Sequence, residues 1–231
     1  MFDNETVQRV EADICKDPTV PLTGPEPGIL LGTGTGFYIS TNGQVLTNHH
    51  VVYGCASVTI DRGGSGDVPL QVLGEDSGND LAILKEAGVV TSPLEFRPLA
   101  SGLRVGESAI LIGYPLRSAL NSETLTEGSV SADNSGNRPR FQMTTPIQSG
   151  NSGGPVFDRS GRVIGIAVSS LKPEGKQIVQ NVNFAVKIDP AQELALPLGV
   201  HLTFSESAAA LSTPDIFDQV KSRVLPLNCY N

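Results

Sequence analysis

From residue 29 onward, apolar and polar positions alternate in short runs that are separated by turn residues. A period of two is typical of half-buried β-strands, and runs this short indicate many strands with tight connections. In the first half of the chain the strands are predicted at residues 29–40, 44–48, 57–61, 69–74 and 80–86. Thr41-Asn42-Gly43 joins the first two as a hairpin, because Asn-Gly suits a tight turn.

The second half continues the pattern, with strands predicted at residues 108–114, 123–132, 140–145, 156–157, 162–169 and 178–187 and a brief one at 200–204. No helical pattern alternates with these runs, so they predict paired antiparallel barrels rather than a parallel sheet. Short helices are expected in residues 1–20, after Asp189-Pro190, and from Thr213-Pro214-Asp215. The fold class is therefore all-β with short terminal helices.

The pattern divides the chain into three parts. Residues 1–28 form an N-terminal extension and a proline-rich linker. Residues 29–204 form the main domain, with one barrel at about 29–105 and a second at about 106–204. Residues 205–231 are expected to dock on the core as a helix and a strand, because their apolar side chains are too many for a solvated tail: Ile216, Phe217, Val220, Val224, Leu225 and Leu227.

Composition narrows the class of partner. Hydrophobic residues make up 39% of the chain and charged residues 17%, which favours a folded chain with a core. The net charge of -8 argues against nucleic acid or an anionic membrane as a partner, because either would require a basic face. No apolar run is long enough to span a membrane, and the first residues lack a secretory signal. The chain is therefore cytoplasmic if Met1 is the native start, or its signal was removed before this numbering.

Three cysteines, Cys15, Cys55 and Cys229, are too few for a disulfide scaffold and do not have the spacing of metal ligands. Neither a metal nor another cofactor is expected. Cys55 is interpreted as a small buried apolar residue, given its neighbours Val51, Val52, Ala56 and Val58. At most one bridge can form, and docking of the C-terminal segment could bring Cys229 to either Cys15 or Cys55.

The most informative segment is Gly150-Asn151-Ser152-Gly153-Gly154-Pro155, which follows Thr47-Asn48-His49-His50-Val51-Val52 and Asn79-Asp80-Leu81-Ala82-Ile83. An acyl-transfer site needs a hydroxyl nucleophile, an imidazole that takes its proton and a carboxylate that orients the imidazole. These three segments supply all of them. The order His, Asp, Ser fits one barrel that provides the base and the acid and a second that provides the nucleophile.

A rival interpretation is the nucleophile elbow of an α/β-hydrolase, in which the order would be Ser152, Asp189, His201. An elbow is followed at once by a helix. Here Pro155 and a strand, turn and strand pattern follow instead, which counts against it.

Seven blocks of the sequence carry a resemblance to a known family. In chain order they are Gly34-Thr35-Gly36-Phe37, Leu46-Thr47-Asn48-His49-His50-Val51-Val52, Asn79-Asp80-Leu81-Ala82, Ile112-Gly113-Tyr114-Pro115, Thr126-Glu127-Gly128-Ser129-Val130-Ser131, Thr145-Pro146-Ile147-Gln148-Ser149-Gly150-Asn151-Ser152-Gly153-Gly154 and Asn183-Phe184-Ala185-Val186. They resemble the HtrA (DegP-like) family of trypsin-fold serine endopeptidases from about residue 32 to residue 187. The resemblance implies two antiparallel six-stranded barrels of the trypsin/chymotrypsin type. It covers the protease domain only, without the PDZ module that many relatives carry.

The resemblance also implies a role for each site residue. His50 is the base, because it directly precedes Val51-Val52, although the residues alone leave His49 and His50 open. Asp80 orients the base and Ser152 is the nucleophile. Backbone amides in the segment Gly150, Asn151, Ser152 form the oxyanion hole. Substrate-binding residues are Pro146, Ile147 and Gln148, of which the first two line the primary pocket. Ala167, Val168 and Ser169 offer an edge for an added strand.

The function expected is a serine endopeptidase that acts through an acyl-enzyme and prefers small or medium apolar residues before the cut. The partners are protein or peptide substrates in extended form, in an extracytoplasmic compartment by resemblance. The alternative is a trypsin-fold scaffold or peptide-binding domain without turnover. A binding module has no reason to keep Ser152, His50 and Asp80 together, which favours the enzyme.

Overall fold

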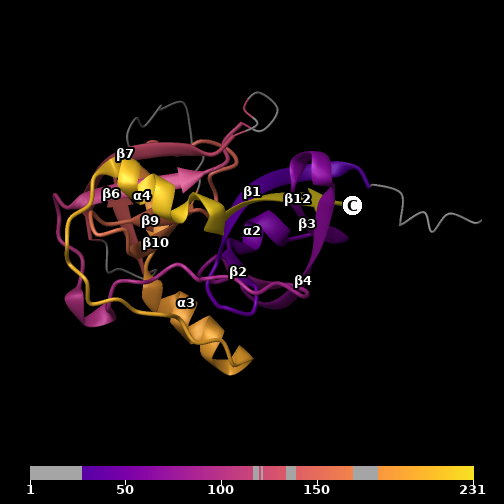
Figure 1. Cartoon of the computed structure of the whole chain (residues 1–231), viewed down its shortest axis with the longest axis horizontal. Coiled ribbons are helices and arrows are strands. Elements are labelled where there is room, and N and C mark those ends of the chain that lie inside the picture. The colour runs from indigo at the N-terminus through magenta and orange to yellow at the C-terminus, as the bar shows by residue number, and fades with distance from the viewer. Residues whose placement is uncertain (1–27, 117–119, 121, 134–138, 169–181) are drawn as a thin grey trace, which may run out of the picture.

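Two closed antiparallel β-barrels form the body of the protein (Figure 1). The computed structural model describes residues 28–116, 120, 122–133, 139–168 and 182–231. Around the first barrel lie, in order, β1 (Leu30–Tyr38), β12 (Val224–Tyr230), β3 (Ser57–Asp61), β4 (Asp67–Asp76), β5 (Leu81–Glu86) and β2 (Gln44–Thr47). Around the second lie β10 (Val163–Val168), β11 (Asn183–Val186), β8 (Arg140–Met143), β7 (Thr124–Ala132), β6 (Ser108–Gly113) and β9 (Pro155–Phe157). The all-β prediction with two six-stranded barrels is confirmed.

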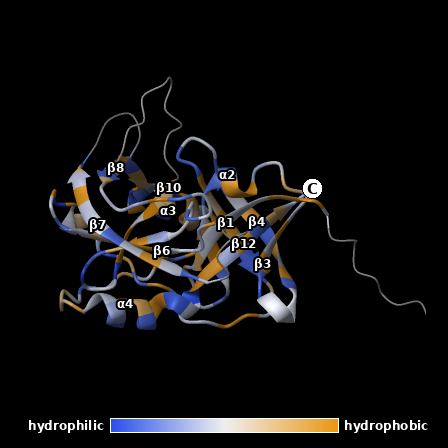
Figure 2. Cartoon of the chain, turned by 90° about the horizontal axis from the view of Figure 1, so that it is seen from above, coloured by the Kyte–Doolittle hydropathy of each residue, from blue (hydrophilic) through white to orange (hydrophobic). Residues whose placement is uncertain are grey.

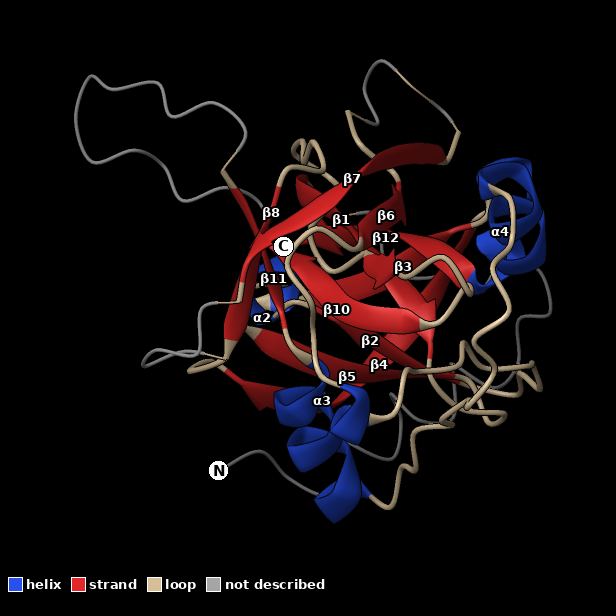
Figure 3. Cartoon of the chain, turned by 90° about the vertical axis from the view of Figure 1, so that its left-hand side faces the viewer, coloured by secondary structure: helices blue, strands red, loops and turns tan. Residues whose placement is uncertain are grey.

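Short helices flank the barrels, and α3 and α4 lie at the periphery of the strands (Figure 3). In the described residues the helices are α2 (His49–Val52), α3 (Ile188–Ala195) and α4 (Thr213–Val220), with the 3-10 turns η1 (Gly63–Ser65), η2 (Leu99–Ser101), η3 (Leu196–Leu198) and η4 (Lys221–Arg223). The α4 helix begins as predicted, and the Ser212 side chain accepts a hydrogen bond from the Asp215 amide. Within the described ranges, none of the helices is long and apolar enough to cross a membrane.

Two local predictions were wrong. The α3 helix forms, but it begins at Ile188 with Lys187 as its N-cap residue, before the start predicted from Asp189-Pro190. The strand predicted at residues 200–204 does not form. Only Phe204 makes an isolated bridge with Phe96, and the alternating apolar residues of this segment pack as a loop on the core. The helix expected in residues 1–20 lies outside the described residues.

The C-terminal strand β12 lies between β1 and β3, as the yellow strand among the indigo and violet ones in Figure 1 shows. It pairs antiparallel with β1, where Val224 faces Phe37, and with β3, where Leu227 faces Ile60. Leu225 and Leu227 are buried inside the barrel. The first barrel is therefore built from two segments that lie far apart in the sequence.

Apolar side chains of the described segments form three clusters, and hydrophobic stretches run along the strands of both barrels (Figure 2). One cluster fills the first barrel around Ile60, and another fills the second barrel around Phe141. The third joins the barrels, with Phe37 from one and Phe157 from the other, and includes residues of α3 and α4. Because the barrels share this core, the loops at their junction are held at fixed relative positions.

The glycine run in β1, Gly32, Gly34 and Gly36, permits close packing at two of its three positions. A Cβ on Gly34 would lie 2.5 Å from Val51 Cγ1, and one on Gly36 would lie 2.8 Å from Val45 Cγ1. Around Gly32 the space is open. The contact at Gly34 allows α2 to pack directly against β1.

Candidate active site

The His50 imidazole and the Asp80 carboxylate are hydrogen-bonded at the edge of the first barrel. His50 Nδ1 lies 2.8 Å from Asp80 Oδ2 and 3.0 Å from Oδ1, and the His50 backbone N–H donates to Oδ1 at 3.0 Å. The α2 helix carries His50 directly after β2, and Asp80 directly precedes β5. These strands are neighbours, with Thr47 facing Ala82, so strand pairing brings the two side chains together.

Asp80 adopts a left-handed backbone conformation that residues other than glycine rarely take. Its φ is +62°, which costs about 1 kcal/mol for an L-residue. The Asn48 side-chain amide donates to the Asp80 carbonyl at 2.8 Å and holds this conformation from the other side. Asn48 and His50 therefore fix both the backbone and the carboxylate of Asp80.

The turn that presents Asp80 is closed by Asp76 at the end of β4. Asp76 Oδ1 accepts from the Asn79 backbone N–H at 3.0 Å, and Oδ2 accepts from the Asn79 side chain at 2.7 Å. Burial alone would raise the pKa of Asp76, but hydrogen bonds from Asn79 and Gly78 and the nearby His49 imidazole lower it below its ordinary value. The turn is thus stabilised by an ionised carboxylate.

Ser152 lies in the loop before β9 and is only 4% exposed. The Thr35 backbone N–H donates to the Ser152 carbonyl at 2.8 Å. Gly153 follows with a φ of +83°, and a Cβ there would lie 2.2 Å from Thr35 O and Thr47 Oγ1 and 3.0 Å from Asn48 N. The Ser152 loop of the second barrel therefore packs against the start of α2, which carries His50.

The peptide between Ser149 and Gly150 has a defined orientation. Its carbonyl oxygen, on Ser149, accepts from the Leu116 N–H at 3.0 Å. In a planar trans peptide the N–H points opposite to the carbonyl, so the Gly150 N–H points away from Leu116. The Asn151 N–H is already used, because it donates to the Gln148 carbonyl at 3.0 Å. Of the predicted oxyanion segment, Asn151 therefore contributes its place in the turn rather than its amide.

The residues predicted for the primary pocket lie just before this turn. Pro146 and Gln148 are exposed, whereas Ile147 is half-buried and packs against the core of the second barrel. The sequence has no aspartate or glutamate from residue 134 to residue 157. Ile147 thus contacts the apolar core of the second barrel, and this segment contributes no carboxylate near it.

The predicted strand-pairing edge is only partly available. The Ala167 N–H donates to Gly154 O at 2.9 Å, and its carbonyl accepts from the Gly153 N–H at 2.9 Å. Both backbone groups of Ala167 thus hold the Ser152 loop instead of facing a substrate. Val168 lies at the end of β10, and Ser169 lies outside the described residues.

The nucleophile-elbow interpretation does not fit the fold. Ser152 is followed by two glycines and by strand β9, whereas an elbow requires a helix at that point. Asp189 is an exposed residue of α3, and His201 is an exposed residue of the loop that follows η3. The His50–Asp80 contact has no equivalent at these positions.

Sequence reasoning assigned no role to several residues that hold the site. They are Thr35, Thr47, Asn48, Glu75 and Asp76. The first three lie inside the seven sequence blocks of the family resemblance, so their position could have identified them. The contact between His49 Nδ1 and Glu75 Oε1, at 3.1 Å, crosses between α2 and β4 and could not be read from spacing.

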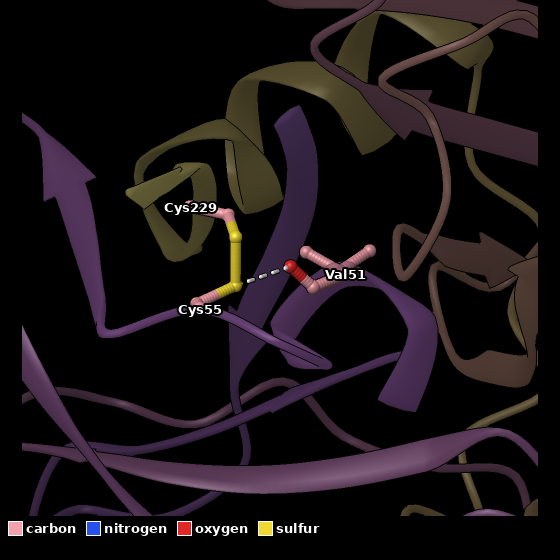
Figure 4. The surroundings of a disulfide bond; sticks show 3 residues. All are labelled: Val51, Cys55 and Cys229. Carbon is pink, nitrogen blue, oxygen red and sulfur yellow. Dashed lines mark hydrogen bonds between the residues drawn. A yellow bond between two sulfur atoms is a disulfide. The ribbon is translucent and has the colours of Figure 1, made fainter. Parts of the chain in front are cut away.

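Cys55 forms a disulfide with Cys229, so its interpretation as a plain apolar residue was wrong (Figure 4). Cys55 lies just after α2, and its Sγ is 3.5 Å from the Val51 carbonyl oxygen. Cys229 belongs to β12, so the bond joins the His50 segment covalently to the C-terminal strand. Across the described parts of the chain, no group of three or more His, Cys, Asp or Glu side chains could hold a metal ion.

Known proteins resemble this chain in sequence and in fold. Residues 34–166 match the family described as the trypsin-like peptidase domain. The chloroplast Protease Do-like 5 of Arabidopsis thaliana is 34% identical over 73% of this chain, and a probable periplasmic DegP-like serine endoprotease of Pseudomonas fluorescens is 32% identical over 70%. An uncharacterised protein of Sinorhizobium fredii, y4bJ, is 34% identical over 97% of this chain.

A crystal structure of a serine endoprotease from Yersinia pestis superposes with a TM-score of 0.59 at 26% identity, and covers 71% of this chain and 57% of that one. This chain spans 57% of the Arabidopsis relative, 34% of the Pseudomonas relative and 36% of y4bJ. The resemblance to HtrA (DegP-like) serine endopeptidases is confirmed by these matches.

Proposed function

Because this chain belongs to the trypsin-like peptidase family, we propose that it is a serine endopeptidase that uses His50, Asp80 and Ser152. The observation that carries the proposal is the hydrogen bond between His50 Nδ1 and Asp80 Oδ2, at 2.8 Å, formed where the Ser152 loop packs against α2. A carboxylate on Nδ1 keeps the proton of the neutral imidazole on that nitrogen. Nε2 is then left with the lone pair that a general base needs.

In the proposed reaction, Ser152 Oγ attacks the peptide carbonyl while His50 Nε2 takes the hydroxyl proton. The protonated imidazole then donates that proton to the leaving amine, and the C–N bond breaks to give an acyl-enzyme. Water attacks the ester in the same way, with His50 as base, and Ser152 recovers its proton when the acid product leaves. Asp80 stabilises the charged imidazole in both halves.

We assign the oxyanion hole to the backbone N–H groups of Gly150 and Ser152. The orientation of the Ser149–Gly150 peptide supports this, because the Gly150 N–H points away from Leu116. Gly150 has a φ of +98°, and a Cβ there would lie 2.4 Å from Tyr114 O, so this backbone requires glycine. Each well-placed donor lowers the barrier by about 3 kcal/mol.

The proposed specificity is for small or medium apolar residues, Val, Ala, Leu or Ile, before the cut. Ile147 packs on the core of the second barrel, and the segment around it carries no carboxylate. A lysine or arginine side chain buried there would lack a partner, which costs several kcal/mol. We propose that an extended substrate adds as a strand at Val168, at the end of β10.

We place the protein in an oxidising compartment outside the cytoplasm. The Cys55–Cys229 disulfide supports this, because such bonds are rare in the reducing cytosol. The printed name of the Pseudomonas relative, which includes the word periplasmic, agrees with it.

The direct test compares wild type with Ser152→Ala, His50→Ala and His49→Ala on unfolded casein and with a fluorophosphonate probe. We expect wild type to cleave casein and to react with the probe at Ser152, and Ser152→Ala and His50→Ala to show neither. His49→Ala should keep substantial activity. A folded wild type that binds peptides but does not react with the probe would establish the scaffold alternative instead. A reversed result for the two histidines would shift the base by one residue.

A further inference from the structure

His49 lies next to the proposed base and contacts Glu75 of β4, the strand that precedes the turn carrying Asp80. Its Nδ1 lies 3.1 Å from Glu75 Oε1, and its ring packs on Tyr53 with centroids 5.2 Å apart. Neighbouring helical residues point about 100° apart, so His49 and His50 face different partners. The His49 side chain is 19% exposed and that of His50 44%, so His50 is the histidine that a substrate can reach.

Glu75 is part of the same unit that presents Asp80. It lies in β4 directly before Asp76, which closes the turn leading to Asp80. Glu75 faces Ala82 on β5, and Ala82 faces Thr47 on β2. The His49–Glu75 contact therefore crosses over β5 and joins the helix that carries the base to the strand that holds the acid's turn.

The α2 helix cannot fix its own orientation. It has four residues, and its N-cap residue Asn48 makes no side-chain cap hydrogen bond to it. A helix this short is marginal without tertiary contacts. The direction of the His50 ring thus depends on contacts made by neighbouring side chains.

Building on the function proposed above, we infer that His49 and Glu75 are positioning residues for the reaction. Their contact holds α2 at the distance from β4 at which His50 Nδ1 reaches Asp80. His49 takes no proton from substrate and does not contact the reacting atoms. It acts through His50, so its loss should slow the chemical step and leave substrate binding nearly unchanged.

The test uses variants that separate the ring from its hydrogen bond. His49→Phe keeps the packing on Tyr53 and removes the donor. His49→Asn places an amide nitrogen near the position of Nδ1 and keeps the donor. Glu75→Leu removes the acceptor, and Gln71→Ala, at an exposed position on the same strand, is the matched control.

We expect His49→Phe and Glu75→Leu each to lower kcat by about three- to tenfold with KM within about twofold, and the rate of fluorophosphonate labelling to fall in parallel. The double variant should lose no more than either single one, because both remove one contact. His49→Asn should recover most of kcat, and Gln71→Ala should match wild type. In wild type, a low-field proton NMR signal of the His50 Nδ1–H should be present, and it should broaden in His49→Phe.

Two results would overturn the positioning role: kcat of His49→Phe equal to that of wild type, or additive losses in the double variant. Should His49→Phe not fold, the comparison of Glu75→Leu with Glu75→Gln decides in the same way, since Gln keeps an acceptor oxygen. Failure of the function itself has a different signature. In that case wild type would show no Ser152-dependent labelling, while the NMR signal of the His50 Nδ1–H would still report whether His49→Phe disturbs the ring.

Discussion

The Thr35 backbone N–H donates to the Ser152 carbonyl across 2.8 Å, and this bond joins strand β1 of the first barrel to the Ser152 loop of the second. The Thr35 hydroxyl adds two more bonds. It donates to Gly150 O at 2.7 Å and accepts from the Tyr114 N–H at 3.0 Å. Thr35 is fully buried, so these bonds are shielded from water. Thr35 of the first barrel thus positions the proposed oxyanion segment of the second.

The first prediction concerns that hydroxyl. Thr35→Val keeps the shape of the side chain but leaves Gly150 O and the Tyr114 N–H buried without their partner, at a cost of about 1–3 kcal/mol each. We expect lower stability and a larger fall in kcat than in KM, measured by thermal unfolding and peptide hydrolysis. Thr35→Ser, which keeps the hydroxyl, should retain most activity. Equal activity of the two variants would contradict the role of the hydroxyl.

Gly153 provides a second test of the junction. Gly153→Ala places a methyl group 2.2 Å from Thr35 O and Thr47 Oγ1, so the loop must move away from the first barrel. The matched control is Gly54→Ala, which has a similar φ of +77° and no atoms within 4 Å of the new methyl. The control should lose about 1 kcal/mol from backbone strain alone. Gly153→Ala should lose clearly more stability and nearly all proteolysis, and similar losses would refute the contact argument.

The sequence predicts the residues of the proposed site more readily than the framework around them. His50, Asp80 and Ser152 stand in blocks of distinctive residue types, and the structure brings the first two into a hydrogen bond at 2.8 Å. The prediction of a strand at residues 200–204 was wrong because alternating apolar and polar residues indicate which side chains are buried, not that the backbone pairs. Val200 and Leu202 are buried, but they lie in a loop.

Long-range pairing was beyond the reach of sequence patterns. The sixth strand of the first barrel comes from residues 224–230, and no local signal says which strand edge it fills. The Cys55–Cys229 pairing follows from that placement: once β12 lies beside β3, Cys229 faces Val58, three residues from Cys55. Contacts such as His49 with Glu75 depend on the same three-dimensional neighbourhood.

The disulfide supplies a third prediction. It joins residues 174 positions apart, and in the chain-entropy description removing such a cross-link costs roughly 2–5 kcal/mol of unfolding free energy. The double variant Cys55→Ser/Cys229→Ser should therefore melt at a lower temperature than wild type. Dithiothreitol should lower the melting temperature of wild type toward that of the double variant and leave the variant unchanged. A reductant effect of equal size on both proteins would show that the bond contributes nothing.

Asp76 gives a fourth prediction, on pH. Its pKa in the folded protein lies below the ordinary 3.8, because the hydrogen bonds from Asn79 and Gly78 outweigh the effect of burial. A group with a lowered folded pKa contributes stability that is present above its unfolded pKa and is lost as pH falls through the folded one. The difference in unfolding free energy between wild type and Asp76→Asn should thus be largest near neutral pH and shrink below pH 3.8. If the difference in unfolding free energy between the two proteins stayed constant down to acid pH, the ionised Asp76 carboxylate would not contribute to stability.

The last prediction concerns the C-terminal segment. Removing residues 213–231 deletes α4 and β12, which leaves β1 and β3 with unpaired edges and opens the apolar clusters that Leu225, Leu227 and Ile216 help to fill. Unpaired backbone groups and exposed apolar surface both destabilise a sheet. We expect the truncated protein to lose its cooperative thermal transition or to have a melting temperature far below that of wild type. Circular dichroism during heating measures this.

A point substitution separates the strand's packing from the effect of cutting the chain. Leu227 is fully buried in the first barrel, so Leu227→Ala should cost about 2–5 kcal/mol. Leu196, half exposed in η3, is the matched control, and Leu196→Ala should change stability by less than about 1 kcal/mol. The unfolding free energies of both full-length variants are measured by chemical denaturation. If the truncated protein and Leu227→Ala both had the melting temperature of wild type, β12 would contribute nothing to the stability of the barrel. A loss in both would establish it as the strand that closes the barrel beside the proposed catalytic loop.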